Sequence, residues 1–563
     1  MPRLRPRKII DMIHNSSFNP VVAYFSMEMM LETDVPTYAG GLGVLAGDIL
    51  RSAADLKIPA VGMSIVYSGD TFSQILHPDG TQSFAKQDWQ KLDQLTKLPH
   101  IIHVEVGDTR VSVGCWRYDI TGLSGFTVPV YLLDTNLVVN PQWARDITKS
   151  LYAGGDTRIC QEIILGIGGV RMLRALGLKN IGTYHLNEGH CAFVPLALMP
   201  EHDYKDEEVK KLCVFTSHTP IPEGHDRFSY DLAYRFASPH LPWHIKKLAG
   251  ENELSMTHLA LNLSRKAFAV SRKHQEVSNR LFPGYNFDYV TNGVHHRTWT
   301  HNYLQDVYNQ YLPGWLDDPS LLKSSSDIPS FDLWTAHLEC KRKLVTYVNR
   351  HLITDEQFDE ATLTISLARR PVSYKRPLLL YHDIPRLLRA ASGRLQIVQC
   401  GKSHPDDDVS QGIVKEIVHI SQSLKHKIKI VFLENYSPKV SRLLVSGSDL
   451  WLNTPMRPLE ASGTSGMKAI LNGLPHFSVL DGWWVEGFAQ NPDSGWTVGP
   501  QNSDTNDDTA DAADLYTKLE SEVLPLYYNR RQEWITKMKH SISLGSHFNS
   551  HRVAKEYLSK AWN

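Results

Sequence analysis

A single lysine follows a turn of small and hydroxylated residues in the stretch EASGTSGMKAILNG, Glu460 to Gly473. The backbone N–H groups and hydroxyls of such a turn, placed between a strand and a helix, can hold a phosphate group. Lys468 lies between Met467 and an apolar run, and apolar neighbours would lower the pKa of its amine. An amine of that kind suits attachment to a carbonyl cofactor, so the stretch is compatible with a pyridoxal phosphate site. The spacing alone is equally compatible with a lysine that extends from a helix surface into solvent.

A second candidate is the basic cluster of LARRPVSYKRPLLL, in which Arg369, Arg370, Lys375 and Arg376 lie close together after a strand-like run. Positive side chains ahead of a helix oppose the helix dipole, unless an anion shares the site with them. The cluster therefore indicates either an anion site or a solvated basic loop, and by itself the loop is the simpler interpretation.

Glycine-rich and histidine-rich segments complete the set. The Gly41-x-Gly43 pattern imitates a dinucleotide fingerprint, but the preceding strand and acidic partner are poorly placed, so we exclude NAD and expect close backbone approach to an anion or a sugar. Because H-E-x-x-H and cysteine pairs are absent from the sequence, we predict no metal site. We expect the histidine-bearing loops to contact sugar hydroxyls, except His295 and His296, which we assign to the core or the surface.

Composition excludes several function classes. A net charge of −1 over 563 residues gives no reason to expect nucleic acid or an acidic membrane as partner. The six cysteines are scattered, no run of 18 apolar residues occurs, and the basic start of the chain lacks the apolar core of a signal peptide. We therefore predict a cytoplasmic protein without a membrane span.

Strand-like runs alternate with helical patterns along the chain, from VVAYFSM and LAGDILRSAADLK to LQIVQCG and GIVKEIVHISQSL. This alternation predicts the α/β class, with parallel sheets and sites at the strand C-termini. The segment Tyr303–Ser330 is turn-rich and lacks a clean period, so we place a domain boundary there.

In order along the chain, these segments resemble the α-glucan (glycogen, starch and maltodextrin) phosphorylases, and in particular their short bacterial and archaeal members. The blocks that carry the resemblance run from about Val21 to about Val498; they include TYAGGLGVLAGD, HLNEGHCAF, FTSHTPIPEGHDRF, TNGVHHRTW, ARRPVSYKR, FLENY, RPLEASGTSGMKAILNG and VLDGWWVEGF. The resemblance implies the GT-B architecture, two Rossmann-like domains that face each other across a catalytic cleft. We place the domains at 1–305 and 306–563, and the last helix of the family often crosses back to the first domain.

The resemblance also implies a cofactor and its ligands. Lys468 matches the lysine that holds pyridoxal 5′-phosphate, whose 5′-phosphate serves this family as a proton relay. The other positions that match its cofactor site are Arg369, Thr464, Ser465, Tyr436, Trp299 and Gly41.

For the substrates, the resemblance implies orthophosphate and an α-1,4-glucan, and no carboxylate pair of the kind that hydrolases use. Orthophosphate would bind to Arg370, Lys375 and the backbone at Gly40–Gly41, protonate the glycosidic oxygen, and attack with retention to give α-glucose 1-phosphate. The positions that match sugar-side or cleft residues are His218, Asn292, Glu460, Ser462, Gly463, Tyr374, Glu188 and His190. Among these matched positions, Arg370, Lys375, His218 and Lys468 are the predicted catalytic set.

Three departures and two alternatives accompany this prediction. Ser437 stands where animal members have an arginine, segments that shape the acceptor cleft look shortened, and the chain begins close to the first catalytic strand. We therefore expect no nucleotide-effector regulation, and a homodimer is one candidate assembly. The alternatives are a nucleotide-sugar glucosyltransferase of the glycogen-synthase kind, which has no use for Lys468 behind a phosphate turn, and a catalytically inactive glucan-binding homologue.

Overall fold

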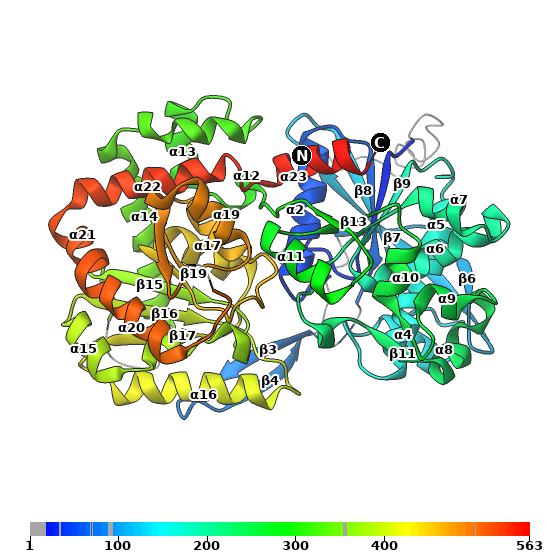
Figure 1. Ribbon diagram of the computed structural model, residues 1–563, viewed down its shortest axis with the longest axis horizontal. Helices are drawn as coiled ribbons and strands as arrows, with labels where there is room; N and C mark the ends of the chain where they lie inside the picture. Colours follow the sequence, from blue (N-terminus) through cyan, green and yellow to red (C-terminus); the bar gives the residue numbers. More distant parts are fainter. Residues whose placement is uncertain are drawn as a thin grey trace.

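The computed structural model describes residues 19–562 except 33–34, 36, 68, 70, 88–93, 353–356 and 502. The start of the chain, where we predict no signal peptide, lies outside these residues. Two sheets of largely parallel strands, each covered by helices, lie side by side in Figure 1. The predicted α/β class with parallel sheets is therefore confirmed. Among the described residues, no helix combines the length and the apolar character that crossing a membrane requires.

The first sheet is built from the N-terminal half of the chain. Its strands β14, β13, β10, β9, β1, β2 and β8 are parallel in that order, and β7 extends the sheet antiparallel. Strand order reverses beside β1, so the loops after β1 and β9 open at the same edge. The strands are β1 Val22–Phe25, β2 Ala60–Ile65, β5 Thr96–Lys97, β6 Ile102–Val106, β7 Thr109–Thr121, β8 Thr127–Asp134, β9 Thr183–Asn187, β10 Cys213–Thr216, β13 Lys266–Ala269 and β14 Phe287–Tyr289.

The second sheet has six parallel strands in the order β17-β16-β15-β18-β19-β20. Numbered from its own first strand, this is the order 3-2-1-4-5-6 of the doubly wound nucleotide-binding fold, with the reversal between β15 and β18. The strands are β15 Leu363–Ala368, β16 Leu395–Cys400, β17 Lys429–Leu433, β18 Leu450–Asn453, β19 His476–Val479 and β20 Gly495–Val498.

Helices cover both sheets, because their apolar faces must be buried against the strands. Those of the first half are α2 Gly41–Asp55, α3 Gln142–Arg145, α4 Asp156–Ile163, α5 Gly169–Ala175, α6 Phe193–Leu198, α7 Asp206–Leu212, α8 Tyr230–Ala237, α9 Ile245–Ala249, α10 Met256–Asn262 and α11 Arg272–Leu281. Those that follow are α12 His296–Trp299, α13 Asn302–Tyr311, α14 Ser330–Arg350, α15 Ile384–Ala391, α16 Asp408–Ser423, α17 Pro438–Gly447, α18 Ser465–Ile470, α19 Trp483–Gln490, α20 Asp508–Lys518, α21 Leu524–Asn529, α22 Arg531–Gly545 and α23 Ser550–Lys560.

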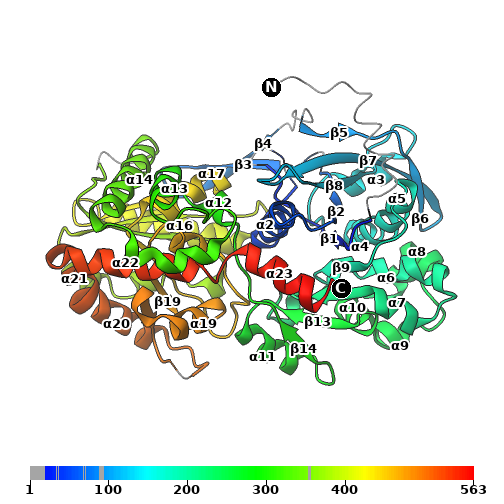
Figure 2. The same ribbon diagram turned by 90° about the horizontal axis from the view of Figure 1, so that it is seen from above.

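Two segments cross between the halves. The hairpin of β3 (Thr71–Leu76) and β4 (Gln82–Gln87) reaches α16 and β17, where Gln82 Nε2 donates to Gln411 O at 3.1 Å. Seen from above, α23 runs from the end of α22 to the first sheet (Figure 2). There the indole N–H of Trp562 donates to His185 Nδ1 of β9 at 2.9 Å.

One local prediction was wrong. Tyr303–Ser330 is not simply turn-rich, since it contains most of α13, whose buried Leu304 and Tyr308 lie one turn apart. The helical segment 156–175 is continuous and consists of α4, a π-helical turn and α5. At the π turn, a side chain on Gly166 would come within 2.5 Å of Phe193, so this close helix contact requires glycine.

Candidate functional site

Two loops leave the second sheet at its point of strand reversal. Arg369 and Arg370 directly follow β15, and residues 454–464 connect β18 to α18. Ligands of doubly wound sheets bind outside the carboxyl ends of the strands at such a point. The topology therefore brings the basic cluster and the EASGTSGMK stretch together, although about ninety residues separate them.

Glu460 is the acceptor that joins these loops. Its Oε2 lies 2.6 Å from Arg369 Nη2 and 2.5 Å from Lys375 Nζ. Burial would raise the pKa of Glu460, but the charges of Lys375 and Arg369 outweigh it and hold that pKa at about 2. Burial and the neighbouring Arg369 charge lower the pKa of Lys375 to about 8. Two cations thus converge on one carboxylate, in a site where an added anion would be attracted.

The other two predicted residues of the basic loop differ in exposure. Arg370 is exposed, whereas the Tyr374 ring is mostly buried, with Lys375 Nζ 4.5 Å from its centre. The backbone of Tyr374 accepts a hydrogen bond from Met456 N at 2.7 Å, which fastens the basic loop to the loop of Glu460. Arg370 is therefore the member of the cluster that is free to meet a ligand from solvent.

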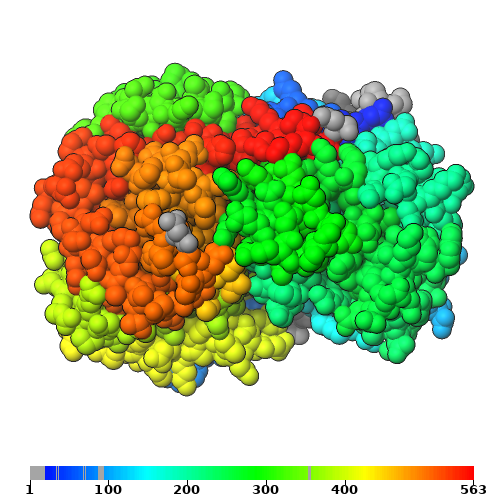
Figure 3. All heavy atoms as spheres, viewed as in Figure 1, coloured from blue at the N-terminus to red at the C-terminus, as the bar shows by residue number. Residues whose placement is uncertain are grey.

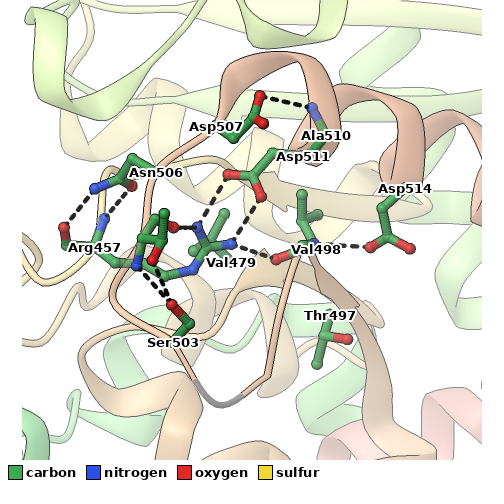
Figure 4. Close-up of polar contacts among 12 residues, drawn as sticks. Arg457, Val479, Thr497, Val498, Ser503, Asn506, Asp507, Ala510, Asp511 and Asp514 are labelled. Carbon is green, nitrogen blue, oxygen red and sulfur yellow. Dashed lines mark hydrogen bonds and ion pairs between the residues drawn. The ribbon is translucent and has the colours of Figure 1, made fainter.

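Arg376, the last member of the basic cluster, does not join the anion site. Its guanidinium is buried and lies 2.7 Å from Asp511 of α20. The same carboxylate holds Arg457 at 3.1 Å, and Figure 4 shows that pair with the surrounding contacts of Val498 and Asn506. Asp511 thus fixes the end of the basic loop and the start of the Glu460 loop with one side chain.

Asp481, a second buried acid, holds the backbone of Glu460 in place. Asp481 accepts hydrogen bonds from Glu460 N at 2.8 Å and from Gly482 N at 2.9 Å. Burial, reinforced by the Glu460 charge, raises the pKa of Asp481 to about 7. Gly482 has φ +53°, and a Cβ there would lie 2.4 Å from Ser462 O, so the turn packs against the predicted sugar-side loop only with glycine.

Lys468 lies in α18 with its amine on an aromatic face. Its Nζ is 3.7 Å from the centre of the Trp299 ring, and the indole N–H of Trp299 donates to Asp48 Oδ2 at 2.7 Å. Burial lowers the pKa of Lys468 to about 8, and the nearby charge of Asp48 only partly opposes this. Across the described residues, no hydrogen bond or ion pair reaches this amine, which therefore remains available for chemistry.

Hydroxyl groups surround the start of α18. Thr464 immediately precedes the helix, and Ser465, its first residue, accepts a hydrogen bond from the indole of Trp451 at 3.2 Å. Tyr436 is held by a hydrogen bond of its hydroxyl to Ser441 at 2.9 Å, and burial raises its pKa to about 12. These residues all belong to the half of the protein that contains the second sheet, as does Lys468.

The first sheet contributes the turn at Gly40–Gly41. Glu28, which follows β1, accepts hydrogen bonds from Ala39 N at 2.6 Å and Gly40 N at 3.0 Å. Its other oxygen accepts from Tyr152 OH at 2.9 Å. A Cβ on Gly41 would meet nothing within 4 Å, so the space beside this turn at the start of α2 is open. The carboxylate fixes the turn while leaving the Gly41 side accessible.

A second group on the first sheet surrounds Glu188. This residue follows β9 with φ +85°, and its Oε2 accepts from His218 N at 2.7 Å. The ring of His218 donates through Nε2 to Asn187 Oδ1 at 2.6 Å, and burial lowers its pKa to about 3, so the ring is neutral. His190 turns into the core instead, where its Nε2 accepts from Met27 N at 3.0 Å.

The two halves contact each other next to the Glu460 loop. Figure 3 shows the α11 region of the first half against the orange part of the second. Ser271 Oγ donates to Ala461 O at 2.6 Å, and Thr291 Oγ1 donates to Glu486 Oε1 at 2.8 Å. Asn292, the residue after Thr291, is buried at this junction. The sugar-side positions Asn292 and Ser462 are therefore supplied by opposite halves.

Comparison with known proteins identifies the family. A family model described as carbohydrate phosphorylase matches residues 242–491. A maltodextrin phosphorylase of Thermococcus litoralis is 36% identical over 96% of this chain and 70% of its own length. The chain belongs to the carbohydrate phosphorylase family. Further relatives are a glycogen phosphorylase of Aquifex aeolicus, 34% identical over 98% of this chain and 87% of that protein, and the muscle form of Mus musculus, 22% identical over 81% and 68%.

The resemblance to α-glucan phosphorylases that we inferred from the sequence is thereby confirmed, and archaeal and bacterial members are among the relatives. Sequence reasoning missed several supporting residues of this carbohydrate phosphorylase. Asp481 and Asp511 each contact the Glu460 loop directly but lie far from it in the sequence. Glu28 holds the glycine turn by accepting hydrogen bonds from its backbone N–H groups. Two supporting residues had a signal in the sequence: Asp48 ends the glycine-rich TYAGGLGVLAGD block, and Asp481 lies in the VLDGWWVEGF block.

Proposed function

We propose that the protein catalyses the phosphorolysis of terminal α-1,4-glucosidic bonds with orthophosphate, as a retaining glycosyltransferase that releases α-D-glucose 1-phosphate. The names of its relatives, maltodextrin phosphorylase and glycogen phosphorylase, support the substrate class. The observation that carries the proposal is Lys468, a buried amine with a lowered pKa that contacts an aromatic ring rather than an acid. A nucleotide-sugar glucosyltransferase would have no use for such a lysine beside the anion site.

The chemistry around Lys468 fits pyridoxal 5′-phosphate. The amine is deprotonated more easily than an exposed lysine, and the hydroxyls of Thr464 and Ser465 precede it at the start of α18. In our proposal Lys468 holds the cofactor covalently, while Thr464, Ser465 and Arg369 bind its phosphate and Trp299, Tyr436 and Gly41 line the site. When bound, the cofactor supplies a phosphate group that can donate and accept protons.

Orthophosphate would bind between the two halves of the protein. Arg370, which is exposed, and Lys375 supply positive charge. Of the turn at Gly40–Gly41, the N–H of Gly41 supplies the donor, because the N–H of Gly40 already donates to Glu28 at 3.0 Å. The bound orthophosphate gives a proton to the glycosidic oxygen and then attacks the glucosyl carbon on the face that the leaving chain vacates. Positioning and charge stabilisation by these residues replace the carboxylate pair of a hydrolase.

The terminal glucose would lie against residues from both halves. In this proposal its hydroxyls meet His218, Asn292, Glu460, Ser462, Gly463 and Tyr374, and Glu188 and His190 shape the wall behind them. The neutral ring and the backbone of His218 are held by Asn187 and Glu188, which supports a positioning role. Contacts such as Ser271–Ala461 close the junction, and a water-poor site favours attack by phosphate over hydrolysis.

The test is an assay of the purified protein with maltodextrin and orthophosphate. We expect release of glucose 1-phosphate together with an absorbance band of bound pyridoxal phosphate. A colourless protein with full activity would overturn the cofactor assignment. A coloured protein that releases no glucose 1-phosphate would favour the inactive homologue, and transfer from a nucleotide sugar in the absence of phosphate would favour the synthase class.

The cellular setting is part of the same proposal. All six cysteines are buried free thiols, which supports a reducing, cytoplasmic compartment. A homodimer remains a prediction, and light scattering of the purified protein measures it directly.

A further inference from the structure

Three buried histidines meet where α2, α12 and α23 come together. His295 and His296 lie at the start of α12 and His551 lies in the first turn of α23. One ring nitrogen of each lies within 4.8 Å of the corresponding nitrogens of the other two, and none of the three residues is more than 1% exposed. The cluster is separate from the residues assigned to substrate and cofactor.

Hydrogen bonds fix the tautomers of two of these rings. His296 Nε2 lies 2.8 Å from Leu316 O, which can only accept, so His296 carries its proton on Nε2. His551 Nε2 lies 3.3 Å from the carboxylate of Asp55 and donates in the same way. The Nδ1 atoms of His296 and His551 are then lone pairs, and both are buried without a hydrogen-bond partner.

These two rings have the environment of metal ligands. A histidine that binds a metal usually donates its other N–H to a carboxylate or a backbone carbonyl, which fixes the ring and makes it more basic. Asp55 has that position behind His551, and Leu316 O has it behind His296. The ring centres are 4.5 Å apart and the planes nearly perpendicular, at 82°, so the two rings are in edge contact and do not stack.

His295 supplies the third imidazole. Its Nε2 donates to the same Asp55 oxygen at 2.8 Å, so its Nδ1 accepts from the hydroxyl of Thr298 at 2.6 Å. For this Nδ1 to bind an ion, the Thr298 hydroxyl must first turn away from it. Nitrogens bound to one tetrahedral Zn²⁺ would be about 3.4 Å apart. Since the present separations are at most 4.8 Å, side-chain rotations that bring the nitrogens at most about 1.4 Å nearer to one another would close the set.

We infer that His295, His296 and His551 form a binding site for one divalent transition-metal cation, with Zn²⁺ the ion that fits best. Three imidazoles without a thiolate suit Zn²⁺ and its neighbours rather than Mg²⁺ or Ca²⁺, which prefer oxygen ligands. Asp55 supplies a negative charge behind the ligands. His295 and His296 begin the short helix that carries Trp299, and the Trp299 ring contacts the Lys468 amine. The ion would therefore help to fix the position of this ring. This differs from our sequence prediction, which assigned the two histidines to the core or the surface.

The experiment titrates chelator-treated, purified full-length protein with Co²⁺, a spectroscopic substitute for Zn²⁺. We expect one equivalent to bind with the visible absorption of a tetrahedral site, and Zn²⁺ to displace it. His296→Asn and His551→Asn should each abolish this signal. Asp55→Asn, which changes a group behind the ligands, should weaken binding about 10–100-fold.

His337→Asn is the matched control. His337 is also buried, donates to a carboxylate (Asp449, 2.9 Å) and has an unpaired Nδ1, but it lies outside the cluster. That variant should bind Co²⁺ as the unmodified protein does. Absence of stoichiometric Co²⁺ binding by the unmodified protein, or equal binding by the cluster variants and His337→Asn, would overturn the inference. If the cluster variants do not fold, the thermal transition of the unmodified protein decides: Zn²⁺ should raise its midpoint above that in chelator, and an unchanged midpoint rejects the site.

Discussion

Lys468 is buried and Lys375 largely so, and burial lowers both pKa values to about 8, yet their surroundings differ in kind. Lys375 lies against a carboxylate and beside another cation, whereas Lys468 lies on the face of Trp299. The Glu460 charge favours the ammonium form of Lys375. Lys468 has no acid in contact among the described residues, although the more distant charge of Asp48 acts on it.

The difference separates two uses of a lysine. A charged amine beside Arg369 attracts an anion and holds it in place, which requires that the proton stay. A desolvated amine on an aromatic surface can lose its proton and react with a carbonyl group.

Removing the reactive amine should have the largest effect. Lys468→Ala should lose the absorbance of bound cofactor and reduce glucose 1-phosphate release by about a thousandfold or more, because covalent attachment is lost. Lys439→Ala, an exposed lysine on α17, is the control and should behave as the unmodified protein. A coloured and active Lys468→Ala protein would show that Lys468 does not hold the cofactor.

Removing an anion-binding charge should affect phosphate alone. Arg370→Ala should lower kcat/KM for orthophosphate about 10²–10³-fold, the usual cost of losing a charge-stabilising donor, with the cofactor spectrum unchanged. Arg389→Ala, an exposed arginine on α15, is the control. If phosphate kinetics stayed the same, our position for the anion would be wrong.

Removing the Asp511 charge should weaken the ion pairs that hold the basic loop in place. Asp511→Asn removes the carboxylate that pairs with the buried Arg457 and leaves Arg376 with only the more exposed Asp508, at 2.8 Å. The loss should cost about 3–5 kcal/mol in the free energy of unfolding. Phosphate kinetics should suffer more than cofactor binding, since the clamp holds the Lys375 loop. Asp514→Asn, whose carboxylate is more exposed and pairs with Lys518, should cost far less in urea unfolding. Equal losses would argue against the clamp.

The smallest expected effect is the pH dependence of orthophosphate affinity, which distinguishes Lys375 from Lys468. Lys375 is mostly protonated below its pKa of about 8 and loses its charge as pH rises through that value. Affinity for orthophosphate should therefore fall up to about tenfold per pH unit above 8. Lys375→Arg keeps its charge and should flatten this fall, as measured by the KM for phosphate between pH 7 and 10. An unchanged slope in Lys375→Arg would assign the titration to another group.

The sequence predicted the class of fold correctly and named the residues of the proposed site, but it did not reveal the residues that hold their loops in place. The EASGTSGMK stretch and the ARRPVSYK loop are recognisable because their residues are neighbours in the chain, and strand alternation places both at sheet edges. Asp511 could not be predicted, because its partners Arg376 and Arg457 are far away in sequence and no local pattern marks the pairing. For the same reason Arg376 was grouped with the anion site, from which its buried ion pair removes it.

The return of α23 to the first sheet has a consequence for how the chain folds. The hydrogen bond from Trp562 to His185 joins residues 377 positions apart, and Val553, Ala554 and Tyr557 are part of the core around β1 and α2. Domains generally fold in the order in which the ribosome releases them, and contacts between distant residues form slowly. Here the first sheet cannot complete its core until α23 has been synthesised. The nascent N-terminal half therefore exposes apolar surface during translation, and we expect it to need a chaperone longer than the second half does.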